Sequence, residues 1–249
     1  MRDIVLITDE KGRKYLAKLD DRTTEISGLG IIASSKLKEA VSIGFVEIGK
    51  RKLRVMRASL NDVISVIERK AQTLTAKDIA MILHYCDIVS GCFVIEGGAG
   101  SGALSIALLS RVRPGGKVVT YELRKDFAEI AMRNVKLASL SDDWILKMGD
   151  ICKPIEESNA DAFIVDIPNP WDSVGTAKAA LRIGGYFCAF VPNVNQLEKV
   201  FRELTKQKFE DVRSYETLQR EMVIHEGGVR PSFEMLGHTG YLVFARKSI

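Results

Sequence analysis

The sequence predicts an α/β protein in which a small N-terminal β domain precedes a doubly wound, mostly parallel sheet. Two patterns and the chain length support this prediction. Short strands separated by glycine turns fill residues 1–58, and from residue 92 onward apolar strands alternate with segments of helical period. Such alternation implies right-handed crossovers and a parallel sheet covered on both faces. A chain of 249 residues can bury this core without disulfides.

The N-terminal domain, residues 1–58, contains short apolar segments joined at Gly12 and Gly49, which are typical hairpin positions. The strands predicted there are Ile4–Thr8, Lys14–Lys18, Ile43–Ile48 and Lys52–Met56. From about Leu60 apolar residues recur every three or four positions, which predicts helices. We therefore expect a linker region of helical character at residues 59–75 and the main domain at residues 76–249.

The main domain is predicted to alternate strands with helices. The strands are Cys92–Ile95, Lys117–Tyr121, Ile145–Met148, Ala162–Val165 and Tyr186–Val191, and the helices are Ala103–Val112, Lys125–Leu137, Val174–Leu181 and Gln196–Gln207. The end of the chain differs, because Phe209–Leu218 and Gly240–Arg246 have strand character with no helix between them. We predict an antiparallel edge there, with both segments exposed and suited to subunit pairing.

Composition indicates a cytoplasmic protein. The apolar fraction of 46% and the charged fraction of 27% are ordinary for a globular domain. No apolar run approaches the roughly 20 residues of a membrane span, and we expect no signal peptide at the N-terminus. The four cysteines stand singly and the chain has three histidines, so we predict no metal site and expect the cysteines to be buried.

Positive charge is concentrated in the N-terminal part of the chain. Residues 1–70 carry 15 Lys and Arg against 10 Asp and Glu, whereas residues 71–249 carry 21 against 22. Such an excess suits either a solvated face of a β domain or a surface that binds a polyanion such as nucleic acid. Charge alone favours the solvated face.

A glycine-rich turn, Glu96–Gly102, follows the first strand of the main domain and opens a helix. Glycines at this place allow close approach of the backbone to a nucleotide, and the helix N-terminus offers free N–H groups. The spacing Gly98-x-Gly100-x-x-Ala103 matches a dinucleotide fingerprint. The same turn resembles the S-adenosylmethionine loop of class I methyltransferases, so the turn alone leaves the cofactor open.

Acidic residues follow the next two strands. Glu122 ends the second strand, 20 residues beyond Gly102, where a carboxylate can accept the hydroxyls of an adenosine ribose. Asp150 follows the third strand and resembles the methyltransferase acid that meets the adenine amino group. The alternative for Asp150 is a surface residue after a glycine turn.

The segment Asp166–Trp171, with the sequence Asp-Ile-Pro-Asn-Pro-Trp, follows the fourth strand. Its acid can accept a hydrogen bond from an exocyclic amine, its prolines stiffen the backbone, and its aromatic ring can stack on a base. Methyltransferases that act on the amino groups of flat nitrogen heterocycles have such a segment, whereas hydride transfer does not require one. The alternative is a proline-rich loop in which Trp171 anchors the core.

Taken together, these segments resemble the tRNA (adenine-N1)-methyltransferase family that modifies position 58 of the T loop, in its archaeal and bacterial homotetrameric form. The resemblance covers nearly the whole chain and includes Arg69-Lys70-Ala71-Gln72, Lys77-Asp78 and the block Gly237–Leu242. The chain departs from the family at Thr75-Ala76, where the family has Tyr-Pro. This departure bears on the stiffness of the loop over the cofactor and not on the chemistry.

The resemblance implies a class I S-adenosylmethionine-dependent fold and methyl transfer to N1 of adenine 58, with adenine 57 a second target in some archaeal members. It implies that Asp166 is the catalytic acid and that the N-terminal β domain grips tRNA. The residues expected to bind S-adenosylmethionine are Gln72, Glu96, Gly98, Gly100, Ser101, Gly102, Glu122, Asp150 and Asp166. The residues expected on the substrate side are Pro168, Trp171, Arg230 and His238, and a structural role is the alternative for His238.

Three other functions fit part of the sequence. A class I methyltransferase acting on a small molecule or a protein would explain the glycine turn and Glu122, but not the basic N-terminal domain. A non-catalytic tRNA-binding subunit should have lost the glycine turn or the acid, and both Gly98 and Asp166 are intact. A dehydrogenase would not need the proline-rich segment.

Overall fold

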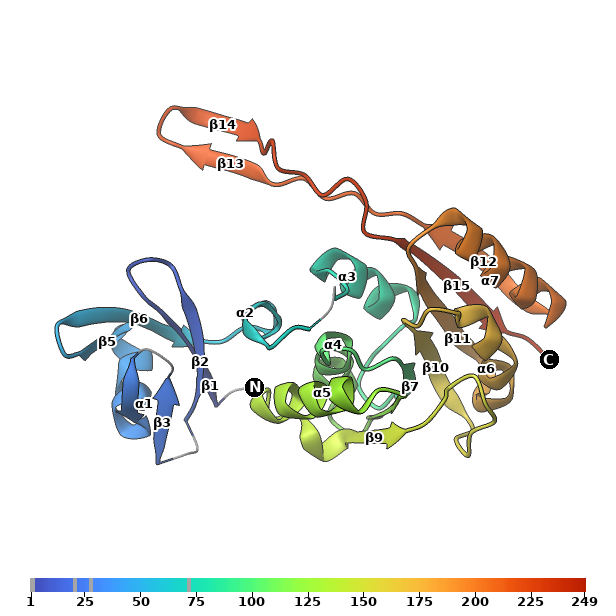
Figure 1. Ribbon diagram of the computed structural model, residues 1–249, viewed down its shortest axis with the longest axis horizontal. Coiled ribbons are helices and arrows are strands. Elements are labelled where there is room, and N and C mark those ends of the chain that lie inside the picture. The colour runs from blue at the N-terminus through green and yellow to red at the C-terminus, as the bar shows by residue number, and fades with distance from the viewer. Residues whose placement is uncertain (1–2, 20–21, 27–28, 71–72) are drawn as a thin grey trace.

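The computed structural model describes residues 3–19, 22–26, 29–70 and 73–249. Its N-terminal part is built on an antiparallel sheet in the order β2-β1-β6-β5, beside a ribbon formed by β3 and β4 (Figure 1). The strands are β1 (Ile4–Thr8), β2 (Lys14–Lys18), β3 (Thr23–Ile26), β4 (Gly30–Ala33), β5 (Phe45–Ile48) and β6 (Arg51–Arg57). Strand β1 is buried throughout, because its alternate side chains enter two different apolar clusters.

The helix α1 (Ser34–Ile43) was not predicted, and the strand predicted at Ile43–Ile48 begins two residues later, at Phe45. Gly44 ends the helix in a left-handed conformation, with φ +86°, and its N–H donates to the Ala40 carbonyl. The helix buries Leu37 and Ala40 but is otherwise largely polar. Its apolar period is therefore too weak to be recognised from sequence.

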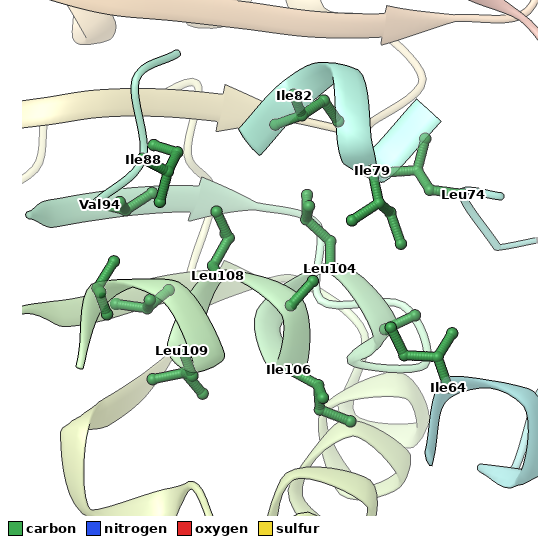
Figure 2. Close-up of a cluster of buried hydrophobic side chains, with 14 of the residues drawn as sticks. Ile64, Leu74, Ile79, Ile82, Ile88, Val94, Leu104, Ile106, Leu108 and Leu109 are labelled. Carbon is green, nitrogen blue, oxygen red and sulfur yellow. The ribbon is translucent and has the colours of Figure 1, made fainter. Parts of the chain in front are cut away.

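Two helices follow the N-terminal sheet in the chain and precede the first strand of the large sheet: α2 (Leu60–Val66) and α3 (Ala76–Tyr85). Ser59 and Asp62 form a reciprocal capping box at the start of α2. Figure 2 shows Ile64 of α2 and Ile79 of α3 converging on Leu104 of the main domain, all within one buried cluster. That cluster also contains Leu6 of β1, so one face of the N-terminal sheet packs into the main-domain core, while its other face has an apolar cluster of its own.

The main domain is a seven-stranded sheet in the order β12-β15-β11-β10-β7-β8-β9. Its strands are β7 (Phe93–Gly97), β8 (Lys117–Glu122), β9 (Trp144–Met148), β10 (Ala160–Val165), β11 (Leu181–Val191), β12 (Phe209–Tyr215) and β15 (Tyr241–Lys247). Its helices are α4 (Ala103–Val112), α5 (Lys125–Leu137), α6 (Val174–Ala180) and α7 (Val194–Lys206), with short 3-10 turns η1 (Ser141–Asp143) and η2 (Pro170–Ser173). Helices α4 and α5 cover one face and α6 and α7 the other (Figure 1). The predicted doubly wound sheet with a small N-terminal β domain is confirmed.

The predicted antiparallel region lies at one side of this sheet, but the prediction of two exposed edge strands is wrong for residues 240–246. Strand β15 pairs antiparallel with β11 and, on its other side, with β12. Both of its rows of backbone hydrogen bonds are used within the sheet, so of these two strands β12 is the edge strand.

A two-stranded hairpin, β13 (Met222–His225) and β14 (Gly228–Pro231), lies between β12 and β15 in the chain. It was not predicted. It extends away from the sheet at the end of two long connecting segments (Figure 1). We call residues 216–240 the arm.

Candidate active site

A cavity of about 350 Å³ lies at the carboxyl ends of strands β7, β8, β9 and β10. This is the edge at which doubly wound sheets bind their ligands. The segments that follow the four strands line the cavity, together with residues 73–74 ahead of α3. The cavity brings together seven of the predicted site residues: Gly98, Gly100, Ser101, Glu122, Asp150, Asp166 and Pro168.

The glycine turn lies against the end of β10. Gly98 has φ +90°, and a Cβ built on it would lie 2.4 Å from the carbonyl oxygen of Asp166. The Asp166 N–H in turn donates to the Gly97 carbonyl, at 2.9 Å. Only glycine permits this conformation at this proximity, so Gly98 couples the turn to the position of Asp166.

Glu122 connects the end of β8 to the glycine turn. Its Oε2 accepts hydrogen bonds from the N–H groups of Ala99, at 2.9 Å, and Gly100, at 3.3 Å. Its Oε1 accepts one from the Arg124 N–H, at 2.9 Å. A carboxylate has about four acceptor positions, so one is left for a ligand hydroxyl, and Glu122 lines the cavity.

Glu96 and Gly102 do not line the cavity. The side chain of Glu96 is fully buried below the turn, where Oε2 accepts hydrogen bonds from Ser105, at 2.5 Å, and Thr120, at 2.6 Å. Within the described residues Oε1 has no partner. Gly102 begins α4, where a Cβ would lie 3.2 Å from Cα of Ala131. Both residues support the turn from below.

The buried position of Glu96 makes the stability of the protein depend on pH. Burial raises the pKa of Glu96 from 4.5 to about 7, against the lowering effect of the hydrogen bonds from Ser105 and Thr120. The native state therefore keeps this proton up to about pH 7, whereas the unfolded chain releases it near pH 4.5. Between these values the contribution of Glu96 to stability falls as pH rises.

We therefore expect Glu96→Gln to stabilise the protein more at pH 8 than at pH 5, by about 2 kcal/mol in the difference between variant and parent. Urea unfolding of both proteins at the two pH values measures this difference. An equal effect at both pH values would show that Glu96 is ionised in the native protein.

Asp166 is the first residue after β10, and its carboxyl group is accessible through the cavity. Protein surrounds it on its other sides, and this desolvation raises the pKa of Asp166 to about 6. Across the described residues no group donates a hydrogen bond to its carboxylate. Asp166 is thus an acceptor ready for a ligand donor and ionised at neutral pH. Asp150, by contrast, already accepts the Cys152 N–H on Oδ1, at 2.9 Å.

The other residues predicted for the substrate side lie outside the cavity lining. Trp171 packs into the apolar cluster behind the segment, with the Lys199 Nζ 4.5 Å from its ring centroid. Arg230 lies on the arm, with its guanidinium 4.3 Å from the Phe233 ring centroid. Gln72, expected to bind the methyl donor, lies outside the described residues.

His238 joins the ends of three strands. Its Nδ1 lies 2.6 Å from Oε1 of Glu216, and its Nε2 lies 2.8 Å from the Pro192 carbonyl. A carbonyl only accepts and a carboxylate accepts, so the protonated ring, which donates from both nitrogens, satisfies both contacts. These two hydrogen bonds raise the pKa of His238. The geometry therefore favours the structural role over direct substrate contact.

Sequence reasoning missed the apolar part of the cavity. Leu74, Tyr121, Phe127 and Ile167 line it together with the predicted polar residues. Phe127 occupies the first turn of α5, and only the position of that helix after Glu122 could have indicated it.

Neither a metal cluster nor a membrane span is found in the part of the chain that the structure describes. No group of three or more His, Cys, Asp or Glu side chains there is arranged to hold a metal ion. No helix there combines the length and the apolar character needed to cross a bilayer.

This strand order, with the antiparallel strand β15 inserted between the parallel strands β11 and β12 and a glycine turn at the end of β7, defines a class I methyltransferase. A family model described as tRNA methyltransferase complex GCD14 subunit matches residues 63–229. The chain belongs to this family, the tRNA (adenine-N1)-methyltransferases.

Similar proteins are known from archaea and bacteria. The tRNA (adenine(57)-N(1)/adenine(58)-N(1))-methyltransferase TrmI of Methanocaldococcus jannaschii is 33% identical, over 97% of this chain and 94% of its own length. The crystal structure of the tRNA (m1A58) methyltransferase TrmI of Aquifex aeolicus has a TM-score of 0.77 at 25% identity, covering 100% of this chain and 98% of its own. A Thermotoga maritima structure, described as a SAM-dependent O-methyltransferase, has a TM-score of 0.83 at 29% identity, covering 100% and 94%.

Proposed function

We propose that this protein transfers a methyl group from S-adenosylmethionine to N1 of adenine 58 in the T loop of tRNA, with adenine 57 as a second target. Family membership supports the reaction, since the M. jannaschii relative is named for both positions. The observation that carries the proposal is Asp166, an ionised acceptor without a partner among the described residues, next to a turn suited to a nucleotide.

The residues of the cavity fit S-adenosylmethionine. The volume of about 350 Å³ lies in the range of small-molecule sites. Glu122 keeps one acceptor position for a ribose hydroxyl, and Gly98 lets the glycine turn pack against the Asp166 backbone at the edge of the cavity. The negative charges of Glu122 and Asp166 favour a cationic ligand. When bound, S-adenosylmethionine supplies a methyl group on a positively charged sulfur.

Asp166 would act on the adenine. N1 of adenine carries a lone pair, so no base is needed before attack. Positive charge develops on the ring as N1 gains the methyl group, and the ionised Asp166 stabilises it by accepting a hydrogen bond from the exocyclic N6. The same carboxylate can take the N6 proton afterwards. Pro168, also at the cavity, would form a flat wall against the base.

The target base must leave the folded T loop to enter this cavity, at an unstacking cost of a few kcal/mol. Phosphate contacts can offset that cost. We assign them to the N-terminal domain, residues 1–58, joined through residues 59–75 to the catalytic domain, residues 76–249. Lys52 and Arg54 are exposed on β6, and the Lys52 Nζ lies 3.9 Å from the Phe45 ring centroid. Such a tRNA-modifying enzyme would act in the cytoplasm.

We further propose that the protein is a homotetramer held together by the arm. Cross-strand pairs Met222 with Pro231 and Ile224 with Val229 place four apolar side chains on one face of the hairpin. Ile224 is 79% exposed and Val229 is 62% exposed. An isolated two-stranded hairpin is marginally stable in water, and contiguous exposed apolar surface is typical of protein contacts.

The double substitution Ile224→Glu with Val229→Glu is therefore expected to convert the tetramer into smaller species, because it places charge on that face. Light scattering after size-exclusion chromatography measures the mass, with Glu226→Gln on the hairpin turn as a control that keeps the parent mass. A parent protein that is monomeric at micromolar concentration would refute the assembly.

Incubation with S-adenosylmethionine and an unmodified tRNA transcript tests the reaction. We expect N1-methyladenosine among the digested nucleosides, and its loss when adenines 57 and 58 are both replaced. Single replacements distinguish the two positions. Binding of the donor without RNA methylation would point to a small-molecule or protein acceptor. Failure to bind the donor would point to a non-catalytic tRNA-binding subunit.

A further inference from the structure

Gln196 makes a hydrogen bond to the segment that carries Asp166. It lies in the first turn of α7, and its Nε2 donates to the carbonyl oxygen of Pro168, at 3.1 Å. The carbonyl can only accept, so the amide nitrogen and not the oxygen must face it. Asn193 caps α7 and so fixes the backbone position of Gln196, because the Asn193 Oδ1 accepts the Gln196 N–H at 3.0 Å.

The other end of the Gln196 amide is unsatisfied. Its Oε1 is buried and has no hydrogen-bond partner among the described residues. Burying such an oxygen costs free energy, which an apolar side chain of similar length would avoid. Gln196 therefore destabilises the fold through one atom while the other atom holds Pro168.

The bond acts on the one backbone angle of Pro168 that its ring leaves free. Proline fixes φ, so ψ of Pro168 sets the direction of its carbonyl and of the following peptide. Leu197 of α7 packs on the same apolar cluster as Trp171, and the Lys199 Nζ lies 4.5 Å from the Trp171 ring centroid. Gln196 is thus the side chain of α7 with a hydrogen bond to the segment Asp166–Trp171 among the described residues.

We propose that Gln196 is a positioning residue for methyl transfer: it fixes the Pro168 peptide so that Asp166 and Pro168 meet the target base in the productive geometry. This inference rests on the proposed function. Gln196 does not line the donor cavity, and among the described residues neither the glycine turn nor Glu122 hydrogen-bonds to it, so its loss should reduce turnover far more than donor binding. A misplacement of about 1 Å can cost as much as 10²-fold in rate.

Two substitutions separate positioning from a merely structural role. Gln196→Met keeps the length, removes the donor and also removes the unsatisfied oxygen. Gln196→Glu keeps the shape but turns a second acceptor towards the Pro168 carbonyl. We expect kcat to fall about tenfold for Met and further for Glu, with KM for tRNA and the Kd of S-adenosylmethionine within about twofold of the parent. The Tm of Gln196→Met should equal or exceed that of the parent.

The matched control is Glu198→Gln, an exposed change on the same helix that should leave kcat unchanged. Parent-like kcat in Gln196→Met overturns the proposal. A parallel fall of Tm, donor affinity and kcat overturns it too, since that pattern reports general disruption.

A readout independent of activity keeps this test separate from the proposed function. In hydrogen exchange measured by mass spectrometry, peptides covering residues 166–173 should exchange faster in Gln196→Met, while those of α4 should not change. If the parent methylates no tRNA, the proposed function fails but the exchange result still decides the positioning role. Unchanged exchange in residues 166–173 then refutes it.

Discussion

Asp166→Asn is expected to lower kcat for tRNA methylation by about 10²–10³-fold, the loss typical of removing one group that stabilises transition-state charge. The amide keeps the size of the side chain but carries no negative charge and cannot take the N6 proton. Its accessible position in the cavity means that the protein should still fold and bind S-adenosylmethionine. Single-turnover kinetics with both substrates saturating, together with donor titration by calorimetry, measures these effects.

The same carboxyl group predicts the pH profile. Because the pKa of Asp166 is raised to about 6 in the free protein, the ionised fraction falls as pH drops below that value. The ratio kcat/KM should therefore decrease about tenfold per pH unit below pH 6, and Asp166→Asn should lose this dependence. Glu156→Gln, at an exposed site outside the cavity, serves as the control. Wild-type turnover in Asp166→Asn would rule out the assigned role.

The residues gathered in the cavity could be predicted because parallel strands end at a common edge. Gly98, Glu122, Asp150 and Asp166 each follow a strand of the predicted sheet, so sequence position alone brings them together. The glycine indicated a turn that a nucleotide can approach, and the acids indicated hydrogen-bond acceptors for its ribose and amino groups. This part of the site depends on local pattern and topology, both of which sequence contains.

Side-chain direction could not be predicted in the same way. Glu96 belongs to the same motif as Gly98, yet its side chain turns below the strand end, to Ser105 of α4 and Thr120 of β8. Trp171 shares a segment with Asp166 but faces the core. Whether such a residue faces a ligand or the interior depends on tertiary packing.

The arm and α1 were not predicted because neither segment shows the regular apolar period of an element with one buried face. The apolar residues of the arm, such as Ile224 and Phe233, are exposed, so they do not follow the period of a buried face. If these side chains contact another subunit, as we propose, the residues that bury them belong to a second copy of the chain, and the pattern of one chain does not show that contact. Gln196 was found only from its distance to Pro168, because a glutamine near a helix start has no sequence signature of its own.

Gly98→Ala is expected to weaken the binding of S-adenosylmethionine by at least about 100-fold and to lower the free energy of unfolding by about 2 kcal/mol or more. The added Cβ would approach the Asp166 carbonyl oxygen to 2.4 Å at φ +90°, so the turn must move away from β10. The Glu122 carboxylate would be displaced as well, because it accepts hydrogen bonds from the N–H groups of the adjacent turn residues Ala99 and Gly100. Calorimetric titration and urea unfolding measure the two effects.

Gly175→Ala is the matched control, since Gly175 lies within α6 and a Cβ there meets no atom within 4 Å. Alanine in a helix interior is favoured over glycine by about 0.5–1 kcal/mol, so this variant should be slightly more stable and bind the donor normally. Comparing the two variants separates the effect of the positive φ and the close contact at Gly98 from the general effect of replacing a glycine by alanine. If Gly98→Ala bound the donor as tightly as the parent, the turn would not form the donor site, and Asp166 would have to act on a ligand held elsewhere in the cavity.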